Sequence, residues 1–215
     1  MIINKKNMFD NQLKPEGISC SRTINSMSKV NREDFTPPKY INLSYADYSI
    51  PLNRDYSMLK PLHVAKILQY LEINKKDEVL EIGTGSGYLT CCMSFMAKFI
   101  DTVDIDLIML EKARAAHKKY NIYNIDYIHK DIFSNWIWGK KYDIIILNGS
   151  IESRIKKLED MLNINGRIFF VMGKYPLMNA NIIKRVSENK LINYQLFETT
   201  INPLKNFNKK KFLNF

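Results

Sequence analysis

Three glycines stand at alternate positions in the segment VLEIGTGSGYLT, residues 79–90, between a strand-like apolar run and a helix-like one. Glycine at positions 83, 85 and 87 lets the backbone turn sharply and approach a ligand with no Cβ in the way. No lysine follows Gly87, so the loop lacks the residue with which a Walker A motif reaches terminal phosphates. The loop is therefore not a nucleoside triphosphate site, and its GxGxG spacing also differs from the GxGxxG of dinucleotide-binding loops.

The neighbours of this loop suit a ligand that carries both a carboxylate and an ammonium. A helix that begins after Gly87 offers free N–H groups and the positive end of its dipole, which favour an anionic group. Glu81, just before the loop, could accept hydrogen bonds from an ammonium. A carboxylate and an ammonium together describe the methionine end of S-adenosyl-L-methionine, which we predict as the cofactor.

Two further acidic residues follow the next two strand-like runs. Asp104, in TVDID, lies at the distance of roughly 20 residues where a carboxylate accepts the ribose hydroxyls of a nucleoside. Asp131, in IHKDIF, is placed to accept the exocyclic amine of an adenine. Either residue could instead cap a helix or turn, but a series of acidic residues at successive strand ends favours a nucleoside ligand. The predicted cofactor-binding residues are Glu81, Gly83, Thr84, Gly85, Ser86, Gly87, Asp104, Asp131 and Asn148.

Strands and helices alternate from residue 61 onward, and this order must position the site. Apolar patterning predicts strands at 77–83, 100–106, 125–131, 142–149, 166–173 and 192–200. Helical spacing predicts helices at 62–73, 88–99, 107–120, 154–162 and 180–188. The alternation predicts an α/β fold with a mostly parallel sheet.

Length and composition favour one domain, since 215 residues with 46% apolar content supply one sizeable core. Residues 31–61 are dense in proline, tyrosine and short polar side chains, which predicts an irregular cap with short helical turns. We therefore divide the single domain into an N-terminal irregular or helical cap, residues 1–60, and a cofactor-binding core, residues 61–215.

The net charge of +10 raises the question of nucleic acid, but the lysines are scattered and only residues 205–212 form a basic cluster. An exposed basic face is favoured over a nucleic-acid contact. The sequence shows no signal-peptide pattern and no bilayer-length apolar run, so we expect a cytoplasmic protein with no membrane association. Three cysteines without a CxxC pair indicate reduced thiols, and three histidines without ligand spacing indicate no metal site.

The chain resembles the protein-L-isoaspartate O-methyltransferases over nearly its full length. The matching stretches, in order, are REDFTPPKY, LSYADYSIPL, PLHVAKILQYL, VLEIGTGSGYLT, YDIIILNGS, INGRIFFVMG and ETTINPL. The resemblance implies a Rossmann-like, doubly wound class I methyltransferase fold. It also implies transfer of a methyl group to the free carboxylate of isoaspartyl residues in damaged proteins. We expect a monomer or weak dimer.

The same resemblance assigns the substrate side of the site. Aligned on Pro61, Leu59 stands where the family has its active-site serine. From their place after the fourth strand, Asn148, Gly149 and Ser150 are expected to border the transferred methyl group, the alternative being an ordinary polar turn. A carboxylate is already nucleophilic, so no general base is needed and we assign no catalytic residue. The residues after the fourth strand read LNGS and not the Asp/Asn-Pro-Pro-Tyr/Phe of amino-methyltransferases, which disfavours methylation of nucleic-acid bases. Two alternatives stay open: a methyltransferase acting on a small molecule or another carboxylate, and a cofactor-binding module without repair activity.

Overall fold

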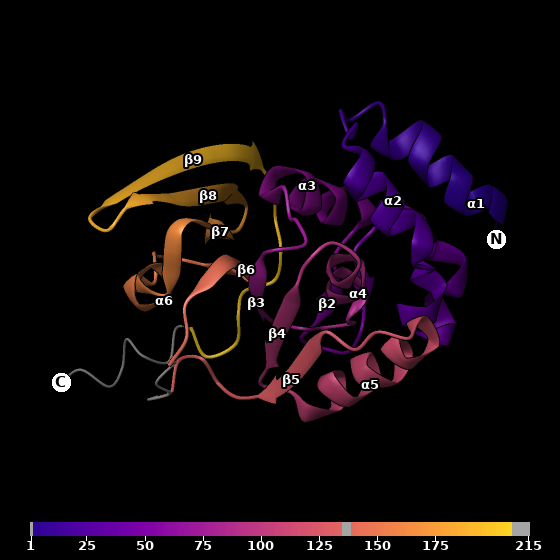
Figure 1. Ribbon diagram of the computed structural model, residues 1–215. Helices are drawn as coiled ribbons and strands as arrows, with labels where there is room; N and C mark the ends of the chain where they lie inside the picture. The colour runs from indigo at the N-terminus through magenta and orange to yellow at the C-terminus, as the bar shows by residue number, and fades with distance from the viewer. Residues whose placement is uncertain (1, 135–138, 208–215) are drawn as a thin grey trace.

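A seven-stranded sheet forms the centre of the computed structural model, which describes residues 2–134 and 139–207 (Figure 1). The strand order is β5-β4-β3-β6-β7-β8-β9, with β3 to β7 parallel and β8 and β9 antiparallel. The strands are β3 (Glu78–Ile82), β4 (Phe99–Asp104), β5 (Ile125–His129), β6 (Tyr142–Ile151), β7 (Leu162–Lys174), β8 (Leu177–Ser187) and β9 (Lys190–Glu198). The predicted α/β class and mostly parallel sheet are confirmed.

Both faces of the sheet are covered, as a doubly wound fold requires. The helices of the core are α3 (Pro61–Leu71), α4 (Tyr88–Ser94), α5 (Leu107–His117) and the short α6 (Lys156–Asp160). In β3, Val79 packs into the apolar cluster that contains α3 and α4, whereas its neighbour Leu80 packs into the cluster that contains Leu158 of α6. This alternation follows from the two-residue period of side chains along a strand.

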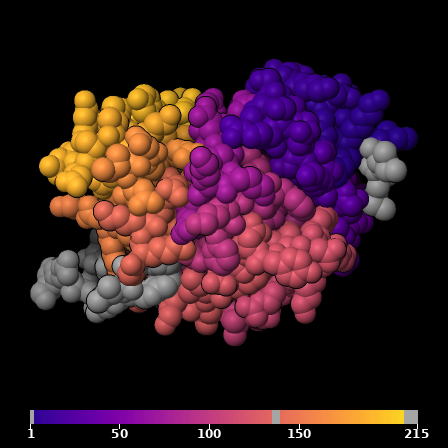
Figure 2. Space-filling view, in the orientation of Figure 1, coloured from indigo at the N-terminus to yellow at the C-terminus, as the bar shows by residue number. Residues whose placement is uncertain are grey.

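The first sixty residues pack against the α3 and α4 side of the core, where Figure 2 shows them in indigo at the opposite end of the molecule from the yellow β9. They form α1 (Ile2–Asn7), the π-helix η1 (Met8–Leu13), α2 (Ser21–Lys29), the 3₁₀ turns η2 (Arg32–Phe35) and η3 (Pro38–Leu43), and a hairpin of β1 (Ile50–Pro51) and β2 (Ser57–Met58). Met8, Met27 and Phe35 share one apolar cluster with Val64 and Cys92 of the core. The boundary at residue 60 stays a prediction.

The predicted helix at residues 180–188 is wrong, because this segment lies within β8, between β7 and β9. Ala180 and Ile183 show the three-residue spacing of a helix, but they enter different apolar clusters on opposite faces of the sheet. A short apolar run that is buried on both sides does not distinguish a helix from a strand by its periodicity.

The described ranges contain no helix that is long and apolar enough to cross a membrane. Within the same residues, no group of three or more His, Cys, Asp or Glu side chains is placed to hold a metal ion. The basic cluster at 205–212 lies outside the described residues from position 208 onward.

One buried carboxylate joins the elements that carry the glycine loop. Glu81 of β3 is completely buried and accepts hydrogen bonds from Thr90 Oγ1 of α4 at 2.5 Å, Thr102 Oγ1 of β4 at 2.7 Å and Asn148 Nδ2 of β6 at 2.7 Å. Burial raises the pKa of Glu81 to about 7 although these donors favour the charged form. The carboxylate therefore fixes three neighbouring elements around the end of β3.

The helix end of the loop is fixed by close packing. Gly87 has φ of 82°, and a Cβ at this position would lie 2.6 Å from Ala113 Cβ and 2.9 Å from His117 Nε2 of α5. His117 Nε2 also lies 2.8 Å from the Gly87 carbonyl oxygen. Glycine is therefore required here both by its backbone conformation and by the approach of α5.

Glu81→Gln should change how the stability of the protein depends on pH. Because the pKa of Glu81 is raised in the folded state, the folded protein binds the proton more tightly, and the free energy of unfolding falls as pH rises from about 4.5 to about 7. We expect the variant to lack this contribution, which amounts to a slope of at most about 1.4 kcal/mol per pH unit. Urea unfolding at pH 5, 6 and 7 measures it.

Glu78→Gln, on the same strand, is the matched control. A hydrogen bond from Lys98 lowers the pKa of Glu78, so this side chain stays ionised over the whole range and its replacement should leave the slope unchanged. Parallel stability curves for the wild type and Glu81→Gln between pH 5 and 7 would contradict the burial of a titrating Glu81.

Candidate functional site

A cavity opens at the carboxyl ends of β3, β4 and β6, with roughly 870 Å³ of empty space including its open mouth. The chain runs from β3 to β4 and β5 on one side of β3 and then crosses to β6 on its other side. The strand order therefore changes direction between β3 and β6. Ligands of doubly wound sheets bind in the crevice at such a point. Nine of the predicted site residues line this cavity, namely Leu59, Gly83, Thr84, Gly85, Ser86, Asp104, Asp131, Asn148 and Gly149.

The glycine loop forms one wall with its backbone exposed to the cavity. Gly83 and Gly85 adopt φ of 91° and 53°, in the left-handed region that glycine tolerates. A Cβ at Gly85 would meet only Leu52 Cδ1 at 3.9 Å, so it would project into open space. Thr84 turns inward, where its Oγ1 lies 2.7 Å from Thr102 Oγ1. The loop therefore offers a cradle that a side chain at position 85 would fill.

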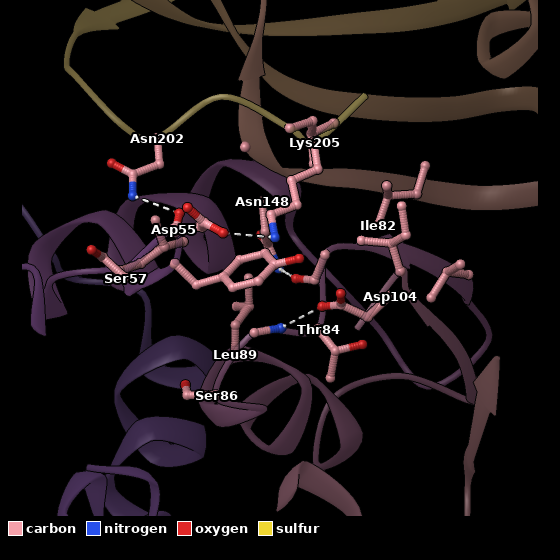
Figure 3. Close-up of a pocket in the computed structure, with 18 of the residues that line it drawn as sticks. Asp55, Ser57, Ile82, Thr84, Ser86, Leu89, Asp104, Asn148, Asn202 and Lys205 are labelled. Carbon is pink, nitrogen blue, oxygen red and sulfur yellow. Dashed lines mark hydrogen bonds and ion pairs between the residues drawn. The ribbon is translucent and has the colours of Figure 1, made fainter. Parts of the chain in front are cut away.

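Asp104 lies at the end of β4 and faces the same space. The side chain is buried, and its two oxygens accept hydrogen bonds from the backbone N–H groups of Gly85 at 3.0 Å and Asp106 at 2.9 Å. Figure 3 shows Asp104 on the wall of the cavity. Desolvation raises the pKa of Asp104. Each carboxylate oxygen can accept a further hydrogen bond. Asp104 thus fixes the loop and keeps acceptor capacity at the cavity wall.

Asn148, at the end of β6, connects the loop to Glu81. Its Nδ2 donates to Glu81 Oε1 at 2.7 Å and to the Gly83 carbonyl oxygen at 2.9 Å. Its Oδ1 is buried and has no hydrogen-bond partner within the described residues. An unpaired buried acceptor is unfavourable, and a ligand N–H group would satisfy it.

Asp131 also lines the cavity, together with the next two residues in the chain, Ile132 and Phe133. Asp131 Oδ1 accepts from the Phe133 backbone N–H at 2.9 Å, and Oδ2 accepts from Asn206 Nδ2 at 2.8 Å. The carboxylate therefore shapes a turn next to apolar side chains, an environment that suits the edge and face of a planar base.

Three predicted site residues do not line the cavity, so their direct contact with a ligand stays a prediction. Glu81 points beneath the loop to its three donors, Gly87 is covered by Ala113 and His117 of α5, and Ser150 points toward the chain end, donating to the Ile201 carbonyl at 3.3 Å. All three support the wall from behind. The pairing of β6 with β7 shifts register between Ile146 and Ser150, and after this irregularity the Ser150 side chain turns away from the cavity that Asn148 and Gly149 line.

Residues 202–207, which we call the C-terminal strap, cross the cavity and were not predicted. The Ser150 N–H donates to the Asn202 carbonyl at 2.9 Å, and the Leu204 N–H donates to the Ser150 carbonyl at 3.0 Å. A Cβ at Gly149 would lie 2.8 Å from Leu204 Cγ, so the strap approaches as closely as it does because position 149 is glycine. Asn202, Pro203, Leu204 and Lys205 all line the cavity.

The opposite rim comes from the β1–β2 hairpin and the residues after it. Ser57 and Leu59 line the cavity, and so does Tyr56, whose buried hydroxyl has no hydrogen-bond partner within the described residues. Leu59 offers no side-chain donor, but its carbonyl accepts from Arg32 Nη2 at 2.9 Å. Arg32 is fully buried and also donates to the Ser44 carbonyl at 2.7 Å, so it fixes the backbone of this rim from inside the cap.

Comparisons with known proteins agree with this geometry. The family model of protein-L-isoaspartate(D-aspartate) O-methyltransferase matches residues 3–207. A Gloeobacter violaceus protein named protein-L-isoaspartate O-methyltransferase is 30% identical over 166 residues, covering 77% of this chain and 81% of that protein. A Geotalea uraniireducens protein named protein-L-isoaspartate O-methyltransferase 1 is 29% identical over 201 residues, covering 92% and 90%.

Among solved structures, the fold is similar to that of a Plasmodium falciparum chain described as a protein-L-isoaspartate O-methyltransferase in complex with S-adenosyl-L-homocysteine. The TM-score is 0.82 at 21% identity, with 94% of this chain and 98% of that chain covered. At this identity the likeness concerns the fold, and it confirms the class I methyltransferase architecture. The family match across residues 3–207, together with the relative at 30% identity, shows that the chain belongs to the protein-L-isoaspartate O-methyltransferase family.

Proposed function

We propose that this chain transfers a methyl group from S-adenosyl-L-methionine to the free carboxylate of L-isoaspartyl residues in damaged proteins. The observation that carries the proposal is the cavity at the end of β3, whose glycine loop, Asp104 and Asn148 match the two ends of that cofactor, in a chain of this family. The methyl ester formed on an isoaspartyl residue closes to a succinimide, whose hydrolysis returns part of the residue to normal aspartate.

The residues present fit the cofactor. The Asn148 Oδ1 acceptor without a partner suits its ammonium, and the backbone of Gly85 and Ser86 suits its carboxylate and the adjacent chain. Asp104 retains acceptor capacity for the ribose hydroxyls, and the turn at Asp131 would hold the adenine. Glu81, Gly87 and Ser150 serve as supports for these contacts.

The chemistry asks the chain to position the reactants and to exclude water. When bound, S-adenosyl-L-methionine supplies an electrophilic methyl group on a sulfonium, which is an excellent leaving group. An acceptor carboxylate is nucleophilic without a base, so the site needs to align the attacking oxygen and to close around it. The C-terminal strap and the β1–β2 rim lie on two sides of the cavity and provide this closure.

We propose further that the enzyme works in the cytoplasm, as a monomer or weak dimer, on protein or peptide substrates and without nucleic acid. Cys20, Cys91 and Cys92 are unpaired, which suits a reducing compartment. After the fourth strand of the core the chain reads Leu-Asn-Gly-Ser, residues 147–150, where an amino-methyltransferase presents the Asp/Asn-Pro-Pro-Tyr/Phe motif. This difference disfavours a nucleic-acid base as the methyl acceptor.

Gly85→Val should abolish cofactor binding, because the side chain would project into the cradle of the glycine loop. Isothermal titration with S-adenosyl-L-homocysteine should detect no binding. Gly17→Val is the matched control: Gly17 also has positive φ, 81°, and a Cβ there would meet nothing within 4 Å. The control should suffer similar backbone strain and bind normally. Equal affinity in the Gly85→Val variant and the wild type would remove this loop from the cofactor site.

A peptide containing isoaspartate should accept a labelled methyl group from S-adenosyl-L-methionine, and the same sequence with normal aspartate should not. The two peptides differ only in which carboxylate is free. Label released as methanol after ester hydrolysis measures the transfer. If neither peptide is methylated while the cofactor still binds, the repair function is wrong, and the small-molecule methyltransferase or the binding module remains.

Leu59→Ser should raise the rate of transfer to isoaspartyl peptide by about 10-fold, if the added hydroxyl recovers about 1.4 kcal/mol of transition-state stabilisation. Leu59 is half-buried at the rim and offers no donor of its own. Leu59→Ala is the control, since it removes the same apolar side chain and adds no donor. A rate that rises equally in both variants would attribute the gain to space and not to hydrogen bonding.

A further inference from the structure

The mouth of the cavity holds an ammonium group in a fixed place. Two lining residues are positively charged, Lys130 and Lys205. Lys205 Nζ lies 2.9 Å from Asp55 Oδ2 and 4.5 Å from the centre of the Tyr56 ring. Figure 3 shows Lys205 and Asn202 reaching from the C-terminal strap toward Asp55, which lies between them. The site therefore already presents a cation that binds a carboxylate at the cavity mouth.

The backbone that carries Lys205 is anchored on both sides of it. The Leu204 N–H donates to the Ser150 carbonyl, and Asn206 Nδ2 donates to Asp131 Oδ2 at 2.8 Å. Phe207 packs edge-on against Phe133, with ring centres 5.6 Å apart. With its backbone fixed and its ammonium over an aromatic ring, Lys205 can reach only a small region of the mouth.

Asp55 is a displaceable partner for this ammonium. The Asp55 and Lys205 side chains are 55% and 40% exposed, and exposed ion pairs contribute little net stability. Asp55 lies in the turn between β1 and β2, where its backbone N–H donates to Asn53 Oδ1 and its carbonyl accepts from Asn202 Nδ2. The turn therefore keeps its backbone contacts when the Asp55 carboxylate leaves the ammonium.

The other lining cation, Lys130, directly follows β5. The Lys130 backbone N–H donates to the Asp104 carbonyl at 3.1 Å, next to Asp131. On the rim formed by residues 55–59, the described side chains offer an acceptor carboxylate two neutral hydroxyls, that of Ser57 and the buried, unpaired phenol of Tyr56, but no cation. Lys205 is thus the charged donor in contact with this rim, through Asp55 and Tyr56.

We propose that Lys205 binds the carboxylate of the methyl acceptor, and that Asp55 occupies its ammonium until the acceptor displaces it. The assignment rests on the proposed function, since it names the residue that selects an anionic acceptor at the same site. It makes Lys205 a specificity-determining residue and Asp55 an internal competitor.

The test is steady-state methyl transfer to an isoaspartyl peptide, with kcat and KM measured for the peptide and for S-adenosyl-L-methionine. Lys205→Met should raise the peptide KM by roughly 10-fold, the scale of losing a charge-assisted hydrogen bond. Lys205→Arg should retain most of the affinity. Asp55→Asn should lower the peptide KM by roughly 3-fold, because the competitor loses its charge. Lys98→Met, which breaks the exposed pair with Glu78 before β4, is the control and should change neither constant.

The opposite effects of Lys205→Met and Asp55→Asn distinguish acceptor binding from a structural tether. If the ion pair only held the strap, both variants would shift the constants in the same direction, and that result would overturn the assignment. A rise confined to the KM of S-adenosyl-L-methionine would place Lys205 on the cofactor carboxylate and would also overturn it. Absence of transfer by the wild type would refute the proposed function itself, and this assignment with it.

Discussion

The burial of one carboxylate determines how this site is built. Glu81 is fully enclosed, and a buried carboxylate is tolerated only when hydrogen-bond donors surround it. Its donors come from α4, β4 and β6, so satisfying Glu81 requires all three elements to meet at the end of β3. The same bonds place Asn148 beside Gly83 and thereby set the wall of the cavity. Because these hydrogen bonds fix the elements around the glycine loop, the loop itself can consist of small residues.

Two segments outside the sheet close the cavity that the strand ends form. The hairpin near residue 55 and the C-terminal strap meet across the mouth of the cavity through Asp55 and Lys205. Gly149 permits the close approach of Leu204, and the Ser150 backbone pairs with the strap on both sides. Without these two segments, a cavity at the carboxyl ends of the strands would be open to water. Methyl transfer requires a site that excludes water.

Sequence patterns were sufficient for the parts of the site that follow directly from strand order. The carboxyl ends of parallel strands lie at one edge of the sheet. The strand order alone therefore predicts that the loop at 83–87, Asp104, Asp131 and Asn148 lie close together, as the structure shows. The support role of Glu81 could not be predicted in this way, because the sequence at the end of a strand does not show toward which face of the sheet a side chain turns. For β8, burial on both faces removed the alternation that identifies a strand.

The C-terminal strap was beyond prediction for a different reason. It depends on pairing between Ser150 and Asn202, which are far apart in sequence, and no local pattern near either residue indicates that contact. Lys205 stood at the start of a basic cluster, a composition typical of an exposed surface. The contacts of Lys205 with Asp55 and Tyr56, which only the structure reveals, place its ammonium at the mouth of the cavity.

The proposed function depends on the binding of S-adenosyl-L-methionine in the cavity at the end of β3. A crystal structure of the chain with S-adenosyl-L-homocysteine would show whether the cofactor binds there. We expect the ribose hydroxyls within hydrogen-bond distance of Asp104, the amino group on Asn148 Oδ1, and the adenine beside Asp131 and Phe133. A ligand bound elsewhere, or one in this cavity with Asp104 and Asn148 Oδ1 making no contact to it, would contradict this binding site.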